Sequence, residues 1–396
     1  MAAAGRTTPS DPAPAEAAAR LDAAPFVRLV GVGTGAGLVA TGLLAGALGA
    51  AAVPFQASVG PLAGTESTTT GDDGDLTLAV GRPGLPADLA LGGDEPTPAV
   101  AYDVAAELEG ADPSPVLALA GLVAADLGSP ESRPALVEAA GLERRPGLGL
   151  PVPDPTTGLA YTTLLHTDAS GDPEAVAERF GIDDESNGRT VEDEGQSGET
   201  AEAEGRALAS KAALAVAAGE APAAAGEAVE VAMHPYVGGP VETVAAYADV
   251  LRALAARAPG LGIQIAMTSE AGGGGDLDAV SEALAHWRDH GEATHEAVSA
   301  SETARHDGLV VATAGDAGPS WAVARLLRDY VSPEPVVVHV GTAAAIATTR
   351  GDPEAFAAAV DTAAGRVDGR IVTAGTRARA VLDDPDTFAD ALREAI

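Results

Sequence analysis

The sequence predicts an α/β protein of two domains, and three observations lead to this prediction. The chain has 396 residues, which is enough for two or three ordinary domains. Apolar segments typical of buried strands alternate with helical patterns on both sides of a polar, acidic run over residues 183–205. Such alternation is typical of a mostly parallel sheet with helices on both faces. We therefore expect an N-terminal α/β domain, a helical and acidic linker, and a smaller C-terminal α/β domain.

The N-terminal domain is expected over residues 25–170 and begins with a strand, a turn and a helix. FVRLVGV, at residues 26–32, is a short apolar run of the kind that forms a buried strand. The leucines of residues 38–50 fall mostly on one helical stripe, so the glycines before them lie in the turn. The pattern further predicts strands over 53–59 and 75–81 and helices over 98–109 and 114–127, the last capped by Ser114.

Two segments are expected to lie outside the domains. Residues 1–24 carry Pro, Asp and Glu where a signal peptide would need an apolar core, so we expect a disordered tail and a cytoplasmic protein. Residues 171–232 are expected to form the linker. Their acidic run has too few apolar side chains to offset the entropy of ordering, and an Ala-rich helix follows it.

The C-terminal domain is expected over residues 233–396. Helical patterns cover residues 241–257 and 279–301, and the apolar run LGIQIAM between them, at 261–267, predicts a strand. Further strands are predicted over 307–315 and 334–341, with a helix between them and two more helices around a glycine-containing turn at the C-terminal end.

The composition restricts the partners of this protein. Acidic residues number 58 against 23 basic ones, which gives a formal net charge of -35, while 46% of the residues are hydrophobic. This combination is typical of a salt-accumulating cytoplasm, where salt screens the repulsion between carboxylates. A surface of this charge repels nucleic acid, so contact with a phosphate backbone needs a local cluster of arginines. The chain has no cysteine, which excludes disulfides and thiolate metal sites.

The glycine-rich stretch at residues 28–48 has three interpretations. It is long and apolar enough for a membrane span, but glycines dilute it and no positive cluster follows, so we expect no span. Gly31, Gly33 and Ala36 fit the dinucleotide-binding pattern G-x-G-x-x-G/A, yet Gln56 and its neighbours lack the carboxylate that would bind a ribose. The third interpretation is a tight turn whose glycines let a helix pack closely against the sheet.

The order of these elements resembles a known family. A strand, a turn ending in Gly37-Leu38, an apolar helix and then Pro-Phe-x-x-x-Val at residues 54–59 resemble the start of archaeal RecJ-like proteins of the DHH phosphoesterase family. The resemblance extends over about residues 25–130 and 235–396, and it implies a DHH-like domain followed by a DHH-associated domain. It also implies Mn²⁺ or Mg²⁺ between these domains, where metal-bound hydroxide attacks a phosphodiester.

The metal ligands of this family are missing at the matching positions. Its His-x-Asp-Ala-Asp-Gly-Leu turn matches residues 32–38, its Asp-Leu-Gly motif matches residues 79–81, and its Asp-His-His motif falls near residues 91–93. The degenerate positions are Val32, Thr34, Ala36, Ala79, Gly92 and Gly93. Two hard cations need several carboxylate or imidazole ligands, so we expect no catalytic residue and no cofactor. Asp94 and Asp126 remain as weak metal candidates, and Mn²⁺ or Mg²⁺ is expected only if substitute ligands preserve the activity.

The family's terminal motif Gly-Gly-His-Pro-x-Ala-Ala-Gly resembles residues 368–375, where an arginine replaces the histidine. In the family this domain grips single-stranded nucleic acid, so the resemblance implies binding of DNA or RNA. The candidate binding residues are Gly369, Arg370, Gly375, Arg377, Arg379, Arg350, Arg325 and Arg328. The alternative is that these arginines only balance local acid through surface ion pairs.

Three functions follow as hypotheses. The first is an inactive RecJ-like subunit that binds nucleic acid or forms complexes in DNA replication, repair or RNA processing, with a GINS-like partner implied by the family. The second is an active metal-dependent exonuclease, and the third a nucleotide-binding module built on residues 31–37. The spacing of His286, His290, His295 and Glu296 could also hold Zn²⁺, but Trp287 and its charged neighbours favour one exposed face of an amphipathic helix instead. The oligomeric state is left open.

Overall fold

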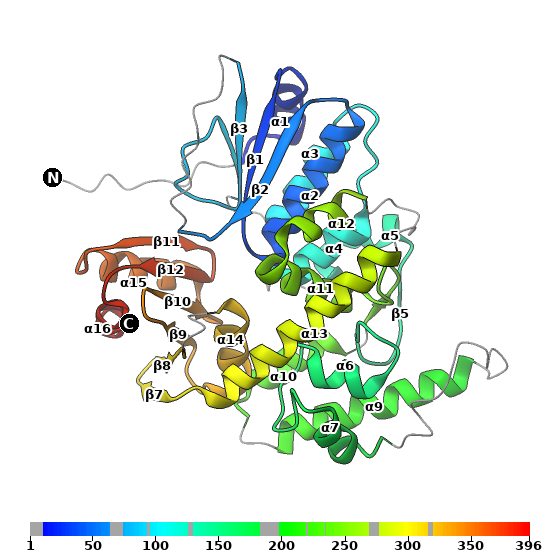
Figure 1. Cartoon of the computed structure of the whole chain (residues 1–396), viewed down its shortest axis with the longest axis vertical. Helices are drawn as coiled ribbons and strands as arrows, with labels where there is room; N and C mark the ends of the chain where they lie inside the picture. Colours follow the sequence, from blue (N-terminus) through cyan, green and yellow to red (C-terminus); the bar gives the residue numbers. More distant parts are fainter. Residues whose placement is uncertain are drawn as a thin grey trace. The chain divides into compact units, whose positions relative to one another are not determined.

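A computed structural model of the chain describes residues 11–63, 74–92, 96–125, 130–182, 198–218, 221–233, 235–268, 277–315 and 320–396 (Figure 1). The chain forms two compact units. The first unit contains Met1–Gly141 and Leu254–Ser281, and the second contains Leu142–Ala253 and Glu282–Ile396. The predicted fold class, with a parallel sheet and a separate C-terminal sheet, is confirmed. The units are discontinuous in sequence, however, and do not follow the expected boundaries.

The first unit is built on a four-stranded parallel sheet in the order β2-β1-β3-β4. Its strands are β1 (Val27–Val32), β2 (Phe55–Gly60), β3 (Leu76–Val80) and β4 (Leu89–Leu91). The strands predicted over 26–32, 53–59 and 75–81 are therefore confirmed. Because all four strands are parallel, their C-terminal ends meet on one side of the sheet, which we call the carboxyl edge. It consists of Gly33, Pro61, Gly81, Arg82 and Gly92, each directly following or near the end of a strand.

Three helices share one core with this sheet. They are α1 (Pro14–Asp22), α2 (Gly35–Ala50) and α3 (Thr97–Ala106), and their leucines and alanines pack against Leu29 and Leu78. The expectation of a disordered tail over residues 1–24 is wrong for the described part, because α1 buries Ala17, Ala18 and Leu21 completely. Residues 1–10 lie outside the described residues. Helix α4 (Pro115–Ala124) begins where predicted, with the Ser114 hydroxyl accepting the Leu117 N–H at 3.3 Å.

The segment LGIQIAM is a helix rather than the strand that the sequence predicts. It lies within α12 (Pro259–Thr268), which packs against α2 in the first unit. Gly42 and Gly46 of α2 make this close packing possible: a β-carbon on Gly42 would overlap that of Ala266, and one on Gly46 would lie 3.1 Å from the Met267 carbonyl oxygen. A short apolar run fits a buried helix as well as a buried strand, so its pattern alone does not distinguish them.

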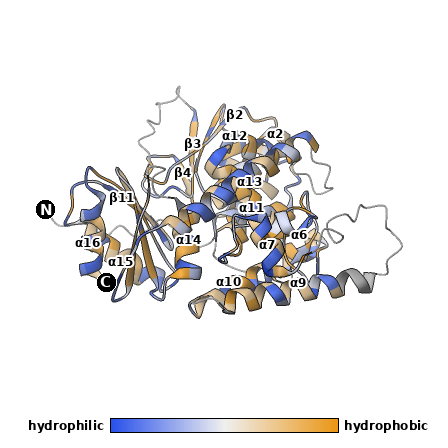
Figure 2. Cartoon of the chain, turned by 60° about the horizontal axis from the view of Figure 1, so that its bottom comes forward, coloured by the Kyte–Doolittle hydropathy of each residue, from blue (hydrophilic) through white to orange (hydrophobic). Residues whose placement is uncertain are grey.

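The second unit contains a six-stranded sheet in the order β11-β12-β10-β9-β8-β7, whose strands carry mostly hydrophobic residues (Figure 2). Only the β8–β9 pair is parallel. The strands are β7 (Thr303–His306), β8 (Leu309–Thr313), β9 (Val336–Val340), β10 (Ala344–Thr349), β11 (Arg370–Ala374) and β12 (Arg377–Val381). The glycine-containing turn predicted near the end of the chain is thus the turn of a β-hairpin, β11–β12.

Helices cover both faces of this second sheet. Helices α15 (Pro353–Ala364) and α16 (Pro385–Ala395) pack against Ala378 and Ala380 on one face. Helix α14 (Trp321–Leu326), with the π-helical turn Leu327–Val331 that follows it, packs against Val310 and Val337 on the other.

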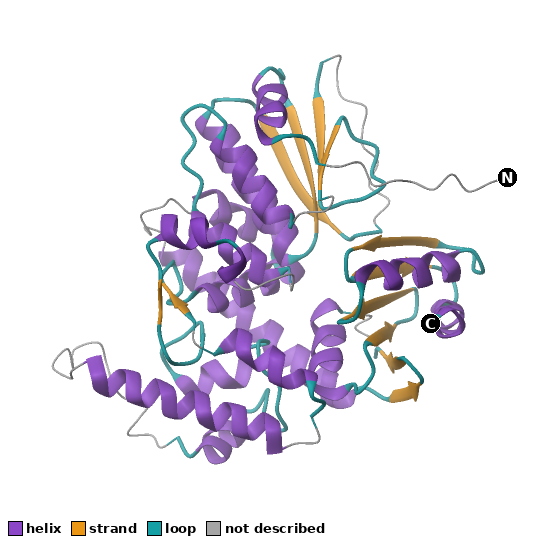
Figure 3. Ribbon diagram, turned by 180° about the vertical axis from the view of Figure 1, so that it is seen from behind, coloured by secondary structure: helices purple, strands orange, loops and turns teal. Residues whose placement is uncertain are grey.

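The rest of the second unit is mainly helical (Figure 3). Its helices are α6 (Pro155–Tyr161), α7 (Pro173–Phe180), α9 (Gly198–Ala218), α10 (Ala224–Ala232), most of α11 (Val244–Arg257) and most of α13 (Leu277–Ala300). Residues 183–197 of the acidic run lie outside the described residues, and its last part, residues 198–205, belongs to α9 rather than to an irregular linker. Nowhere in the described part of the chain is there a helix both long and apolar enough to cross a membrane.

Candidate functional site

The hairpin β11–β12 places three of the predicted arginines on one face of the sheet. Arg379 lies opposite Val372, Arg377 opposite Ala374, and Arg370 opposite Val381. Residues paired directly across two strands point to the same side, so these three side chains lie on the face away from Ala378 and Ala380. We call Arg370, Arg377 and Arg379 the arginine face. The helices α15 and α16 cover the opposite side of the sheet.

Arg379 lies at the centre of this face. It is half-buried, and burial lowers the pKa of its guanidinium, which remains charged at any physiological pH. Its buried Nε has no hydrogen-bond partner among the described residues. An N–H group removed from water without an acceptor costs free energy, so an oxygen acceptor placed here would be stabilising.

Arg377 and Arg370 lie on either side of Arg379. The guanidinium of Arg377 lies over the ring of Trp321, 5.8 Å from its centroid. Trp321 is partly exposed at the start of α14. Arg370 is exposed at the beginning of β11. The arginine face therefore combines cationic groups with one accessible aromatic ring.

The two candidate glycines shape the ends of this hairpin. A β-carbon on Gly369 would lie 2.8 Å from the β-carbon of Leu382 and 2.9 Å from the Val381 carbonyl oxygen, so only glycine fits there. Gly375 has φ +55°, in the left-handed region that the hairpin turn requires. Both residues are thus explained by the backbone of the hairpin.

The other three predicted arginines bond within the fold, and their binding of nucleic acid stays a prediction. Arg325 is only 8% exposed, and its Nη2 donates to the Thr163 carbonyl oxygen at 2.6 Å. Arg328 is 6% exposed and forms a two-point ion pair with Asp329, through Nε at 2.6 Å and Nη2 at 2.9 Å. Arg350 donates to the carbonyl oxygens of Arg328, Ser332 and Pro333. These guanidinium groups hold α14 and its neighbouring loops in place.

A buried polar cluster that the sequence analysis missed lies in the second unit. Asp249 of α11 is completely buried and accepts hydrogen bonds from the hydroxyls of Thr162 and Thr163, the Thr163 N–H, and Trp287 Nε1. One signal in the sequence is the lone carboxylate in the mostly apolar stretch VAAYADVLRALAA, whose other polar side chains are Tyr247 and Arg252. Arg325 donates to Thr163 and so joins the same cluster. Every oxygen of Asp249 is engaged within the fold.

Two histidines lie next to this cluster. His295 Nε2 lies 2.9 Å from the Thr162 carbonyl oxygen and donates to it, so neutral His295 accepts at Nδ1 from His166 Nδ1, 3.0 Å away. Their rings are stacked, with centroids 5.3 Å apart. The pKa of each ring is lowered to about 4; burial is the largest cause for both, and the proximity of His295 also contributes for His166.

The helix α13 does not form a zinc site. His290, His295 and Trp287 are buried, which also corrects the expectation of an exposed helix face, while His286 is partly exposed beside Glu282. Among the described residues no three His, Cys, Asp or Glu side chains come together as metal ligands would.

The carboxyl edge of the first unit does not fit two metal ions. Thr34 caps α2, its hydroxyl accepting the Gly37 N–H at 3.2 Å, while Val32, Ala36 and Ala79 are buried and apolar. Gly92 donates its N–H to the Asp11 carboxylate at 2.8 Å. Gly93, Asp94 and Asp126 lie outside the described residues. The side chains described at the matching positions therefore offer too few oxygen or imidazole ligands for hard cations.

A buried arginine, which the sequence analysis also missed, lies at this edge. Arg82 follows Gly81 at the end of β3 and is only 3% exposed. Its Nη2 donates to the Pro61 carbonyl oxygen at 3.1 Å, just after the end of β2. No signal in the sequence indicates this role, because a single arginine after a glycine is typical of any surface loop.

The glycines of the β1–α2 turn serve close packing. A β-carbon on Gly31 would overlap the Thr41 hydroxyl, and one on Gly37 would overlap the Val32 carbonyl oxygen. A β-carbon on Gly33 would lie 3.1 Å from the Gly60 carbonyl oxygen. Packing alone thus accounts for Gly31 in β1 and Gly33 in the turn, the two glycines named for the dinucleotide-binding pattern, and for Gly37 in α2.

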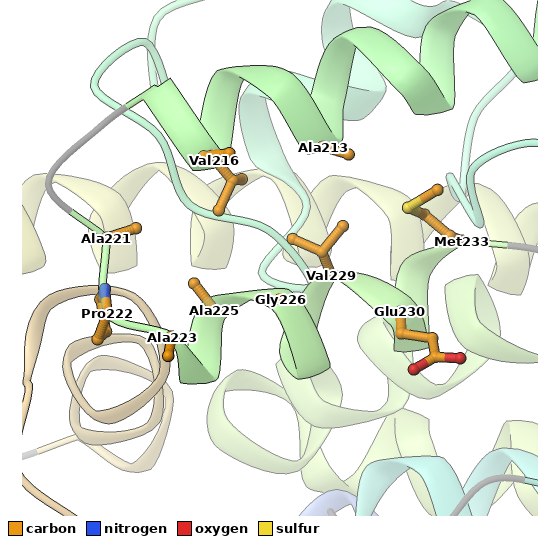
Figure 4. Close-up of a pocket in the computed structure, with 11 residues that line it drawn as sticks. Ala213, Val216, Ala221, Pro222, Ala223, Ala225, Gly226, Val229, Glu230 and Met233 are labelled. Carbon is orange, nitrogen blue, oxygen red and sulfur yellow. The ribbon is translucent and has the colours of Figure 1, made fainter.

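A pocket of about 580 Å³ lies between α9 and α10 (Figure 4). Val216, Ala225 and Val229 line it, with the carboxylate of Glu230 and the thioether of Met233 toward one end (Figure 4). Its lining holds one carboxylate and no nucleophile or base beside it. It offers apolar contact rather than chemistry.

Comparisons with known proteins bear on both the family and the fold. A family model described as the C-terminal domain of the uncharacterized protein rrnAC1427 matches residues 301–394. The protein rrnAC1427 of Haloarcula marismortui is 43% identical to this chain over 403 residues, covering 100% of both.

Two solved structures are similar over nearly the whole chain. CDC45 from Entamoeba histolytica has a TM-score of 0.54 at 9% identity, covering 96% of this chain and 97% of that one. RecJ from Thermus thermophilus, in complex with Mn²⁺, has a TM-score of 0.49 at 16% identity, covering 98% of this chain and 55% of that one. The likeness to CDC45 shows a shared fold.

Proposed function

The chain belongs to the family of Haloarcula marismortui rrnAC1427, and from this premise we propose that it is a RecJ-like protein that binds single-stranded nucleic acid without hydrolysing it. The observation that carries the proposal is the arginine face: Arg370, Arg377 and Arg379 share one side of a hairpin, with Trp321 beside them. The resemblance of the terminal glycine motif to that of RecJ-like proteins supports the same location.

The chemistry of this face suits a single strand. Guanidinium groups donate in a planar fork that matches phosphate oxygens, and the unpartnered Nε of Arg379 supplies a donor already removed from water. Single-strand binding combines such cations with aromatic rings on which bases stack, the role we propose for Trp321. Because the chain carries a net charge of -35, the rest of its surface repels the strand and confines binding to this face.

The proposed lack of hydrolysis follows from the first unit. A two-metal phosphodiesterase needs ligands that hold both cations, and the matching positions here carry Val32, Thr34, Ala36 and Ala79. An active nuclease would need substitute ligands such as Asp94 and Asp126. A nucleotide-binding module on residues 31–37 loses its main support, because packing explains those glycines.

The cellular role we propose is that of a cytoplasmic, complex-forming subunit in DNA replication or repair, or in RNA processing. Support comes from the fold shared with CDC45 and from the sequence resemblance to archaeal RecJ-like proteins. A GINS-like complex is the partner that this resemblance favours. The nucleic acid is a single strand of DNA or RNA.

Fluorescence anisotropy with labelled single strands tests the binding. The double variant R370A/R379A is compared with wild type across a KCl titration. Each lost phosphate contact lowers the steepness of log K against log salt by about 0.7, so the double variant is expected to bind weaker with a slope reduced by about 1.4. The matched control R366A/R393A removes two surface arginines paired with Glu394 and Asp390; Arg366 lies in the turn after α15 and Arg393 in α16. Equal loss in both double variants contradicts the proposed face.

The same preparations test hydrolysis. Labelled strands incubated with protein and Mn²⁺ are expected to keep their length. Metal-dependent shortening that is lost on substitution of Asp94 and Asp126 would establish the active-nuclease alternative.

A further inference from the structure

Arg82 crosses the carboxyl edge of the first unit from one strand to another. It starts at the end of β3, and its guanidinium donates to the Pro61 carbonyl oxygen after β2. The strand β1 lies between β2 and β3 in the sheet. The side chain therefore passes over the end of β1, where Gly33 and Thr34 begin the turn into α2.

This is the edge where open α/β sheets usually bind ligands, beyond the C-terminal ends of the strands. Here a charge belonging to the protein itself lies there, since Arg82 is 3% exposed. The positive charge of the guanidinium repels any divalent cation brought close to it. At the same time it donates to backbone oxygen, the type of acceptor that a bound cation would otherwise satisfy.

We infer that the Arg82 guanidinium takes the place of a metal ion, joining β3 to β2 across β1 and making the carboxyl edge independent of divalent cations. This inference rests on the proposed lack of metal-dependent hydrolysis. Nucleic-acid binding is measured at the arginine face in the other unit, so failure of that binding leaves the inference on Arg82 untouched.

Two measurements on the full chain in molar KCl test it. The first is a titration of wild type with Mn²⁺, followed by electron paramagnetic resonance and by the melting temperature Tm. No tight uptake at micromolar Mn²⁺ and an unchanged Tm are expected. Uptake of one or two ions per chain with a raised Tm would overturn the inference.

The second compares R82A with R20A. Arg20 also donates to a backbone oxygen in the first unit, that of Asp88 at 3.1 Å, but it is exposed. We expect R82A to lower Tm by about 5 °C or more and R20A by about 1 °C or less. Ethylguanidinium at millimolar concentration is expected to raise the Tm of R82A alone, because it fills the vacated site. Equal Tm values for both variants, or no specific rescue, contradict the inference.

If R82A does not fold, R82K and R82Q carry the test. If the positive charge at position 82 stabilises the carboxyl edge, R82K is expected to have a higher Tm than R82Q. An equal or lower Tm for R82K would refute the proposed role of Arg82.

Discussion

Removing the buried histidine pair should flatten the dependence of stability on pH in the acid range. His166 and His295 are held neutral by burial, with pKa values lowered from 6.5 to about 4. Nearby charges act on them in both directions: Asp168 and Asp249 raise these pKa values, while Arg325 and His290 lower that of His295. Burial remains the largest cause for both.

The sign and the size follow from proton linkage. A histidine whose folded pKa lies below its unfolded value binds protons more readily in the unfolded chain, so stability is complete above pH 6.5 and decreases as pH falls toward 4. One ring with these values loses about 2 kcal/mol of unfolding free energy at pH 5 and at most about 3.4 kcal/mol below pH 4. The Nδ1 atoms of the two rings are 3.0 Å apart, so their effects on the free energy of unfolding are not independent. The loss for the pair is therefore expected to lie between one and two times the loss for a single ring.

Urea unfolding of wild type and of H166Q/H295Q between pH 7.5 and 4.5 measures this effect. Carboxylates contribute equally to both proteins, so the difference between the two curves isolates the pair. The control H286Q removes a partly exposed histidine from the same helix, and it is expected to retain the wild-type profile. Parallel curves for wild type and the double variant would show that the pair is not responsible.

Three further predictions concern packing and buried polar contacts. G37A places a β-carbon against the Val32 carbonyl and is expected to lower the free energy of unfolding by about 1–3 kcal/mol. The control G226A, in α10, places a β-carbon where no atom lies within 4 Å and is expected to be neutral or stabilising. Similar urea midpoints for the two variants would contradict this prediction. D249A leaves four buried donors without their acceptor and is expected to lower the free energy of unfolding in urea by about 3 kcal/mol or more. A loss below about 1 kcal/mol would show that the Asp249 cluster contributes little to stability. R328A removes the ion-pair partner of the buried Asp329 carboxylate and is expected to lower the free energy of unfolding by about 3–5 kcal/mol. The folded fraction of R328A is expected to bind single strands with wild-type affinity. Weaker binding in the anisotropy assay would place Arg328 in the nucleic-acid interface.

The first unit could be predicted from sequence because its signals are local. The strands β1, β2 and β3 are apolar runs bounded by turn residues, and Ser114 followed by proline marks the start of a helix. The hairpin strands RIVTA and RARAV were harder, because arginines at alternate positions interrupt the apolar pattern. The same alternation is what places those arginines on one face.

The surroundings of several candidate site residues depend on distant partners. Arg325 looks exposed in sequence, but its acceptor is Thr163, 162 residues away. Burial of a charge is decided by such pairing, and no local pattern encodes it. Arg82 was missed for the same reason: its acceptor, the Pro61 carbonyl, directly follows β2, which is not a neighbour of β3 in the sheet.

The contact between Gly42 and Ala266 has a consequence for biosynthesis. Helix α2 emerges early from the ribosome, but α12, which lies against its small residues, is translated more than two hundred residues later. Until α12 is synthesised, the side of α2 that packs against it remains exposed to solvent and accessible to chaperones. An expression fragment that stops at Gly141 would leave that side of α2 uncovered, and only a polypeptide that extends through Ser281 contains the whole first unit.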